Sequence, residues 1–202
     1  LLADIRQLKH DLYFDETKKG LFEVVEAIKE GAMRTSEIVD GLRNFSRLDE
    51  GELKQADIHV GVENTLVLLT PKIKDGEIEI VRAYDDLMPE LNCYPGQLNQ
   101  VFMNLLSNAI EAIEGLGKIT VRTRNYDDFV TISIKDDGRG IPKENLSKIF
   151  EPFFTTKGLG KGTGLGLSIS FGIIKRHHGK IEVSSKTGAG AEFIITIPKD
   201  LS

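Results

Sequence analysis

One stretch of this chain decides the fold: Gln97-Leu-Asn-Gln-Val-Phe-Met-Asn-Leu-Leu-Ser-Asn-Ala-Ile-Glu-Ala-Ile-Glu114. At a helical rotation of about 100° per residue, its polar side chains gather in one narrow stripe. The rest of the helix surface is mostly apolar, so we expect the helix to be buried on most sides. The stripe must then face a polar cavity or water. It comprises Gln97, Gln100, Asn104, Ser107, Asn108 and Glu111.

The stripe consists mostly of amides, whereas a solvated helix face usually carries charged side chains. Amide oxygens suit a hydrated Mg²⁺ ion, which takes oxygen ligands and keeps several of its waters. The stripe therefore favours a nucleotide or phosphate site, with a solvated face as the alternative.

A first glycine-containing segment, Asp136-Asp-Gly-Arg-Gly-Ile141, comes directly after a predicted strand. Its first carboxylate is a hydrogen-bond acceptor at a strand end. The glycines beside it leave room for a flat ring, because they carry no Cβ. An ordinary strand-end turn is the alternative.

A second segment, Gly158-Leu-Gly-Lys-Gly-Thr-Gly-Leu-Gly-Leu-Ser168, is denser in glycine. It resembles a phosphate-binding loop that runs into a helix N-terminus, where free N–H groups and the helix dipole favour anions. It is not a Walker loop, because Gly162 follows Lys161, and no register gives a dinucleotide-binding fingerprint. A flexible linker is the alternative.

Between the two segments, Ile149-Phe-Glu-Pro-Phe-Phe-Thr-Thr-Lys157 places three phenylalanines around a proline. We expect these rings to anchor the glycine-rich segment to the core. Lys157 is expected to meet a terminal phosphate, with a solvated lysine as the alternative.

Apolar periodicity predicts alternating helices and strands from residue 56 onward. Helices are expected over residues 60–74, 95–114, 142–148 and from 163 or 164 to about 178. Strands are expected over residues 77–84, 91–94, 119–125, 130–135, 181–185 and 192–197. This order predicts an α+β fold, a two-layer α/β sandwich in which helices cover one face of a sheet.

The first 50 residues have a different pattern. Their apolar residues alternate steps of four and three, the spacing of a coiled coil or helical bundle. We expect an α-helical hairpin in residues 1–50, with a polar turn at 15–19 and a second helix over 17–48, followed by a separate domain at 56–202. One amphipathic helix packed on the core is the alternative.

Composition excludes several classes of protein. The chain has 202 residues, a formal net charge of −5 and a single cysteine, Cys93. The negative charge argues against a nucleic-acid partner, which requires a basic stripe. No apolar run reaches the roughly 18 residues of a transmembrane helix, so no membrane segment is expected in this chain. One cysteine allows no internal disulfide, and a cytoplasmic setting fits, whether or not the parent protein is membrane-anchored.

Together and in this order, the motifs resemble the ATP-binding domain of sensor histidine kinases, which belongs to the Bergerat-fold superfamily. The N-box is matched by residues 100–109, the first glycine box by 136–140, the F-box by 150–157 and the second glycine box by 162–166. Residues 187–193 resemble the closing glycine motif, and residues 36–47 resemble the second helix of the kinase dimerisation hairpin. The resemblance implies a Bergerat-type fold and an ATP-dependent protein-histidine kinase.

The resemblance also implies ATP and Mg²⁺ as cofactors and gives each matched residue a role. Asn108 would coordinate Mg²⁺, Asn104 would be the catalytic residue beside the phosphates, and Asp136 would accept from the adenine amino group. Further nucleotide contacts are implied for Gly138 and Gly140 at the ring, and for Lys157, Gly162, Thr163, Gly164, Leu165 and Gly166 at the phosphates. Glu111 stands where a basic residue often follows the N-box, so it is given no phosphate role.

The implied partners are a second copy of the chain, paired through the hairpin, and the receiver domain of a response regulator. The γ-phosphate would pass to a histidine on the hairpin and then to a receiver aspartate. His10 is followed by an acid but lacks the polar residue and proline of a phosphoacceptor motif. The acceptor is therefore expected upstream of Leu1, in a hairpin that this chain contains only in part.

Two other functions are alternatives. The first is a non-catalytic, ATP-gated dimerisation or interaction module; the intact Asn108, Asp136 and second glycine box favour the enzyme over it. The second is a Bergerat-type ATPase that hydrolyses ATP with a glutamate base. The place expected for that base holds Asn104, an amide that cannot take up a proton.

Overall fold

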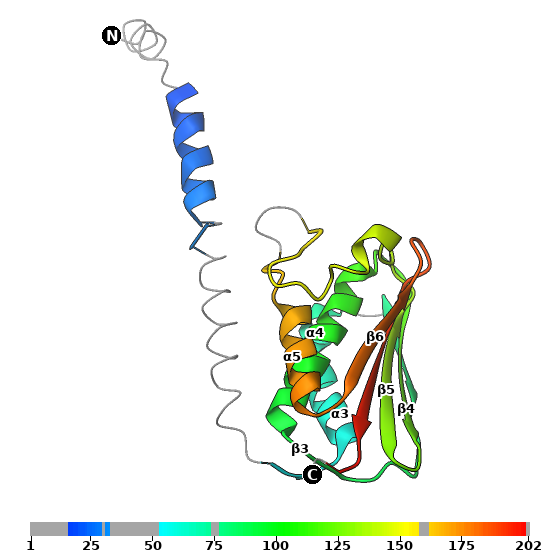
Figure 1. Ribbon diagram of the computed structural model, residues 1–202. Helices are drawn as coiled ribbons and strands as arrows, with labels where there is room; N and C mark the ends of the chain where they lie inside the picture. The colour runs from blue at the N-terminus through cyan, green and yellow to red at the C-terminus, as the bar shows by residue number, and fades with distance from the viewer. Residues whose placement is uncertain (1–15, 30, 33–52, 74–76, 158–161, 201–202) are drawn as a thin grey trace, which may run out of the picture.

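The structure is a computed structural model that describes residues 16–29, 31–32, 53–73, 77–157 and 162–200. From β1 onward it has two layers, a five-stranded sheet and three helices along one face of that sheet (Figure 1). The strands are β1 (Lys54–Ala56), β2 (Ile78–Ala83), β3 (Leu91–Cys93), β4 (Gly117–Asn125), β5 (Phe129–Asp136), β6 (Lys180–Ser185) and β7 (Ala191–Pro198). The helices are α3 (Ile58–Leu69), α4 (Pro95–Ala112) and α5 (Gly166–Arg176), with the short 3-10 helices η2 (Thr70–Lys72) and η3 (Lys143–Asn145).

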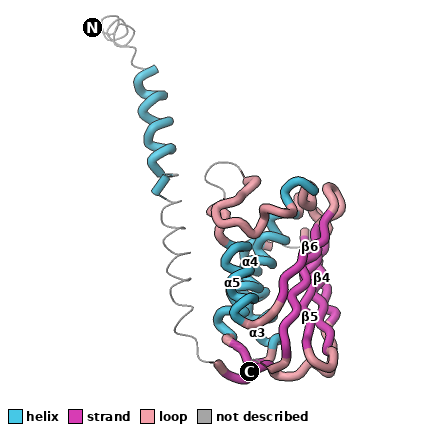
Figure 2. The backbone as a smooth tube through the Cα atoms, viewed as in Figure 1, coloured by secondary structure: helices cyan, strands magenta, loops and turns pink. Residues whose placement is uncertain are grey.

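The larger sheet is mixed, with the strand order β2-β4-β5-β7-β6. β2 runs parallel to β4, and all other neighbours in this sheet are antiparallel. Every second residue of β7 is buried, which is typical of a sheet with one covered face. Figure 2 shows the same division, with the cyan helices on one side of the magenta strands.

α4 is the central helix of the second layer, packed between α3 and α5 and against β5. Fully burying one large apolar side chain contributes about 1.5–3 kcal/mol, so such a face fixes the rotation of a helix. The rotation of α4 in turn sets the direction of its polar stripe. The apolar face of α4 comprises Leu98, Val101, Phe102, Leu105, Leu106, Ala109 and Ile110.

The predicted two-layer α/β sandwich is confirmed, and every predicted strand is present with its ends within two residues of the prediction. The helix ends differ more. α3 begins at Ile58, where the Asp57 carboxylate accepts from the His59 and Val60 N–H groups. The helix ends at Leu69 and η2 follows, because Pro71 has no N–H with which to continue the helical hydrogen bonds. α5 begins at Gly166 rather than at 163 or 164, because Gly164 has a left-handed φ of +68°.

Two further differences concern short elements. The helix predicted over 142–148 is reduced to the 3-10 helix η3 and turns around it. The short strand β1 was not predicted; it pairs antiparallel with β3, from Lys54 opposite Cys93 to Ala56 opposite Leu91. This pairing ties the start of the α/β region to the strand that precedes α4.

Residues 16–29 and 31–32 are helical, so the predicted polar turn at 15–19 is wrong for residues 16–19. Lys19 and Glu23 form an ion pair at 4.0 Å, a spacing that supports a helix. The remainder of the predicted hairpin lies outside the described residues, and the division into domains at 1–50 and 56–202 stays a prediction. In the part of the chain that the structure describes, no helix is both long and apolar enough to cross a membrane.

Cys93, the last residue of β3, is a free thiol with no exposed surface. Burial disfavours the thiolate and raises the pKa of Cys93 to about 11. Because the thiolate is the reactive form of cysteine, this side chain is chemically inert near neutral pH.

His177 connects the end of α5 to the start of α4. Its Nε2 accepts from the Tyr94 N–H at 3.1 Å, so its Nδ1 carries the proton and donates to the Ile173 carbonyl at 2.8 Å. The ring is therefore neutral, and burial lowers its pKa from the ordinary value of 6.5. Protonation of Nε2 would replace an acceptor by a donor facing the Tyr94 N–H.

We expect this arrangement to lose stability in acid. The unfolded chain takes up a proton on this histidine near pH 6.5, whereas the folded chain does so only at lower pH. The contribution of His177 to the free energy of unfolding is therefore present above pH 6.5 and is lost as the pH falls. His177→Gln should reduce the free energy of unfolding at about pH 8 and flatten its decline toward about pH 5.5. Urea denaturation at several pH values measures this.

The control is His178→Asn, which removes the adjacent exposed histidine from a position with a φ of +53° that Asn tolerates. It should keep the wild-type decline. An equally steep decline in His177→Gln would contradict the assignment.

Candidate functional site

A cleft of about 650 Å³ lies beside the polar face of α4. Its other walls are the end of β5 with the turn that follows, the segment from Ile149 to Lys157, and the start of α5. Nine of the predicted site residues line it: Asn104, Asn108, Asp136, Gly140, Lys157, Gly162, Thr163, Gly164 and Gly166. Gly138 and Leu165 adjoin it without forming its wall, and Gln97, at the start of the predicted stripe, is buried instead.

Asp136 is the last residue of β5 and presents a buried carboxylate to the cleft, with 4% of its surface exposed. Its Oδ1 accepts from the Gly138 N–H at 2.9 Å. Burial raises the pKa of this carboxyl group, and hydrogen bonds from the Gly138 and Ala191 backbone oppose that rise. A carboxylate held in a cleft against such a cost is typical of a binding site.

Gly138 and Gly140 are required by the protein's own backbone. A Cβ at Gly138 would lie 2.4 Å from the carbonyl oxygen of Ala112, the last residue of α4. Gly140 has a φ of +68°, and its Cβ would lie 2.2 Å from the Lys186 carbonyl oxygen. The glycines at both positions were predicted to leave room for a ligand ring, but in the structure close packing of the chain itself already requires them.

Asn104 ties α4 to the start of α5. Its Nδ2 donates to the Gly166 carbonyl at 2.9 Å and to Ser170 Oγ at 3.1 Å, and its Oδ1 accepts from Gln100 Nε2 at 3.1 Å. The amide is thus held in one orientation at the wall of the cleft, next to the N-terminus of α5. Free N–H groups at such a terminus favour anions.

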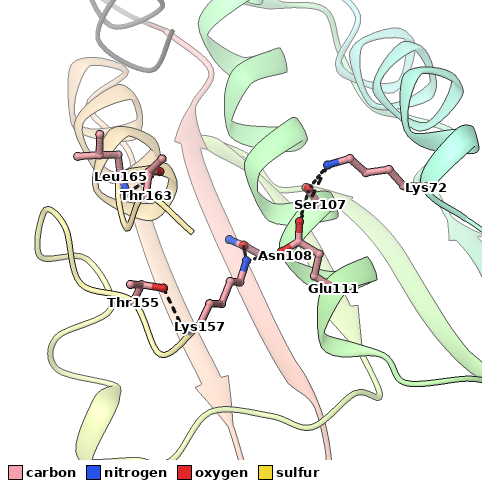
Figure 3. A network of polar contacts seen from close by, with 8 residues as sticks. All are labelled: Lys72, Ser107, Asn108, Glu111, Thr155, Lys157, Thr163 and Leu165. Atoms are coloured by element: carbon pink, nitrogen blue, oxygen red, sulfur yellow. Dashed lines mark hydrogen bonds and ion pairs between the residues drawn. The ribbon is translucent and has the colours of Figure 1, made fainter. Parts of the chain in front are cut away.

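The far side of the cleft carries a network of charged and polar side chains (Figure 3). The Lys157 ammonium donates to Asn108 Oδ1 at 3.3 Å and forms an ion pair with Glu111. Lys72, at the end of η2, donates to Ser107 Oγ at 3.1 Å. Lys72 was not predicted as a site residue. It reaches the cleft because α3 packs beside α4, a contact between distant residues that no local sequence pattern indicates.

The second glycine box is positioned by a tight crossing of two segments. Gly164 has a φ of +68°, and a Cβ there would lie 2.4 Å from the backbone of Phe153, whose own φ is +67°. Thr163 Oγ1 accepts from the Leu165 N–H at 3.3 Å, and the buried Leu165 side chain anchors the start of α5. Residues 158–161 of the glycine-rich segment lie outside the described residues.

The fold and this cleft have counterparts among known proteins. Residues 93–201 match the family model described as histidine kinase-, DNA gyrase B-, and HSP90-like ATPase. The chain belongs to this family of ATPases.

Within the family, the similar proteins are sensor histidine kinases, which are ATP-dependent protein-histidine kinases. The signal transduction histidine-protein kinase AtoS of Escherichia coli (strain K12) is 38% identical over 164 residues, which cover 81% of this chain and 27% of AtoS. The catalytic domain of histidine kinase ThkA superposes with a TM-score of 0.66 at 36% identity, covering 73% of this chain and 96% of that domain.

ThkA has also been solved in complex with the response regulator protein TrrA; that ThkA chain gives a TM-score of 0.65 at 30% identity, covering 82% of this chain and 49% of ThkA. The chain spans between 20% and 38% of the length of the curated relatives AtoS, ZraS and CckA.

Proposed function

We propose that this chain is the catalytic core of a two-component sensor histidine kinase, which binds Mg²⁺-ATP in the cleft and presents the γ-phosphate to a histidine. The observation that carries the proposal is the convergence on one cleft of a buried carboxylate, Asp136, and two amides of one helix stripe, Asn104 and Asn108. The sensor kinases among the relatives support the same reaction.

Asp136 is proposed to recognise the adenine base. Its buried carboxylate would accept a hydrogen bond from the exocyclic amino group, and the acceptor is fixed in place by the Gly138 N–H. Guanine presents a carbonyl oxygen where adenine presents the amino group, so the same carboxylate would repel it. This contact would select ATP and ADP over guanine nucleotides.

Asn108 is proposed to hold the metal ion. The position already attracts a cation, because the Lys157 ammonium lies 3.3 Å from Asn108 Oδ1. Mg²⁺, when bound with the nucleotide, would neutralise charge on the phosphates, and an amide oxygen is a suitable ligand for it. Lys157 would then be free to contact a terminal phosphate directly.

Asn104 is proposed to align the phosphates through α5. By holding the Gly166 carbonyl and Ser170, it fixes the direction of the first N–H groups of α5 at the cleft wall. Thr163, Gly164 and Gly162 line the same end of the cleft. Transfer of a phosphoryl group needs little covalent help from the protein, so positioning and electrostatics of this kind supply most of the rate.

The partners of the whole protein are part of the same proposal. The helix at residues 16–29 exposes Leu21, Phe22, Val25 and Ile28, each with more than half of its surface exposed, as a surface for a second copy would. A response-regulator receiver domain is the proposed acceptor of the phosphate, as the complex of ThkA with TrrA suggests by analogy. The proposed location of this portion is the cytoplasm.

Asp136→Ala should weaken ADP binding roughly tenfold to a hundredfold, because it removes a charge-assisted hydrogen bond worth about 1.5–3 kcal/mol. Titration calorimetry measures this. The matched control is Asp137→Ala, which removes the same charge from a side chain that accepts from the Lys118 N–H at 2.8 Å. Unchanged ADP affinity in Asp136→Ala, or GTP affinity equal to that of ATP, would contradict the adenine assignment.

Asn108→Ala should weaken ATP binding mainly when Mg²⁺ is present. The reason is that its amide oxygen is proposed to hold the ion rather than the nucleotide. Calorimetric titrations in Mg²⁺ and in EDTA separate the two. A loss of equal size in EDTA would show that Asn108 holds the nucleotide or the fold.

Phosphotransfer is tested with radiolabelled ATP and separate dimerisation hairpins that carry an intact phosphoacceptor motif. The chain should place acid-labile label on their histidine, slowly, because the tether that raises the effective concentration is absent. Asp136→Ala should reduce the label. Tight ATP binding without transfer to any hairpin would favour the non-catalytic module, and label on this chain that His10→Gln removes would place the acceptor at His10.

A further inference from the structure

A lysine–carboxylate cluster closes one side of the cleft. We define this Glu111 cluster as Lys72, Ser107, Glu111 and Lys157, all of which line the cleft. In Figure 3 the two lysines approach the end of α4 from opposite sides, Lys72 from η2 and Lys157 from the end of the F-box. Both reach the carboxylate of Glu111.

Each oxygen of that carboxylate serves one side of the cluster. Oε1 accepts from Ser107 Oγ at 3.2 Å and lies 4.0 Å from the Lys72 ammonium, which itself donates to Ser107 Oγ at 3.1 Å. Oε2 is paired with Lys157. A single anion thus gathers two ammonium groups that come from separate parts of the chain.

Lys72 is held in this position by its backbone. It ends the 3-10 helix η2, in which Pro71 restricts φ and the Ile73 N–H closes the turn on the Thr70 carbonyl at 3.0 Å. η2 continues directly from α3, which packs against α4, and from there the Lys72 side chain reaches Ser107, 35 residues further along the sequence. The backbone of Lys72 therefore has a set place beside the cleft, and its side chain lines the cleft.

A more highly charged anion can easily replace the Glu111 carboxylate as the partner of the two lysines. The side chains of Lys72, Glu111 and Lys157 keep 56%, 40% and 26% of their surface exposed. Pairs this exposed change an equilibrium constant by about fivefold at most. A polyphosphate carries more charge than one carboxylate and offers more acceptor oxygens, so it can displace the carboxylate from both lysines.

Building on the proposed nucleotide function, we propose that Lys72 and Lys157 form a two-sided clamp for the nucleotide phosphates and that Glu111 occupies the place of those phosphates until a nucleotide binds. Glu111 is then a positioning residue: it keeps both lysines in the cleft and competes with the ligand for them. The affinity of the cleft for a nucleotide therefore depends on how many phosphates the nucleotide carries.

The test is calorimetric titration of the whole chain with adenosine, AMP, ADP and ATP, in Mg²⁺ and in EDTA. Glu111→Gln keeps the size of the side chain and an oxygen for Ser107, but removes the competing charge. We expect it to raise ADP and ATP affinity about two- to fivefold and to leave adenosine affinity unchanged. Lys72→Met should lower ATP affinity by a similar factor, again without changing adenosine.

The matched control is Glu182→Gln on β6. It removes the same charge from an exposed ion pair, Lys180–Glu182 at 2.8 Å, outside the wall of the cleft. It should change no affinity. A gain in affinity cannot result from misfolding, so Glu111→Gln reports on the clamp even if Lys72→Met perturbs the fold.

Three results would overturn the clamp. The first is unchanged ATP affinity in Glu111→Gln. The second is a loss of ATP affinity in Glu111→Gln confined to Mg²⁺, which would make Glu111 a metal ligand, and the third is an equal gain in Glu182→Gln, which would reduce the effect to net charge. Failure of the proposed function gives a different result, because the wild-type chain would then bind neither adenosine nor ATP. Adenosine binding with ADP and ATP affinities that ignore Glu111 would refute the clamp alone.

Discussion

The position of the whole cleft depends on one backbone contact at the end of α4. The carbonyl of Ala112, the last residue of the helix, accepts from the Arg139 N–H at 2.9 Å, and Gly138 fits against the same carbonyl. This contact holds the turn after β5 against the helix, so the carboxylate of Asp136 and the amide of Asn108 face one space. It also ends the helix, because the last carbonyl is already used.

The other end of the cleft is fixed by side-chain and steric constraints. Asn104 joins α4 to the first turn of α5, and the crossing of Phe153 and Gly164 brings the glycine box next to that turn. Phe153 and Gly164 both have a left-handed φ at this crossing, a conformation that strains Phe153 but suits a glycine. The cleft is therefore held between a backbone contact at one end and an amide tie at the other, with α4 as the shared wall.

The features that could be predicted from the sequence are those encoded locally. A polar residue recurring about every 3.6 residues predicts the polar stripe of α4, and alternating apolar and polar residues predict each strand of the larger sheet. The two layers and the α4 wall of the cleft follow from these patterns. The features that could not be predicted depend on contacts between distant residues. β1 exists because Lys54 pairs opposite Cys93, and Lys72 enters the site because η2 lies beside α4. The need for glycine at 138 and 140 was predicted for a ligand, but the neighbours that demand it are backbone atoms of distant residues.

The burial of Cys93 has a practical consequence for spectroscopy. The chain has one cysteine, and it is inaccessible, with a thiol pKa raised to about 11. Maleimide and iodoacetamide reagents require an accessible thiolate, so the native protein gives almost no background with them. A cysteine introduced at Glu182 or Leu116, both exposed, would then be the single labelled position. Pairs of such positions would accept donor and acceptor dyes without first deleting a native thiol from the core.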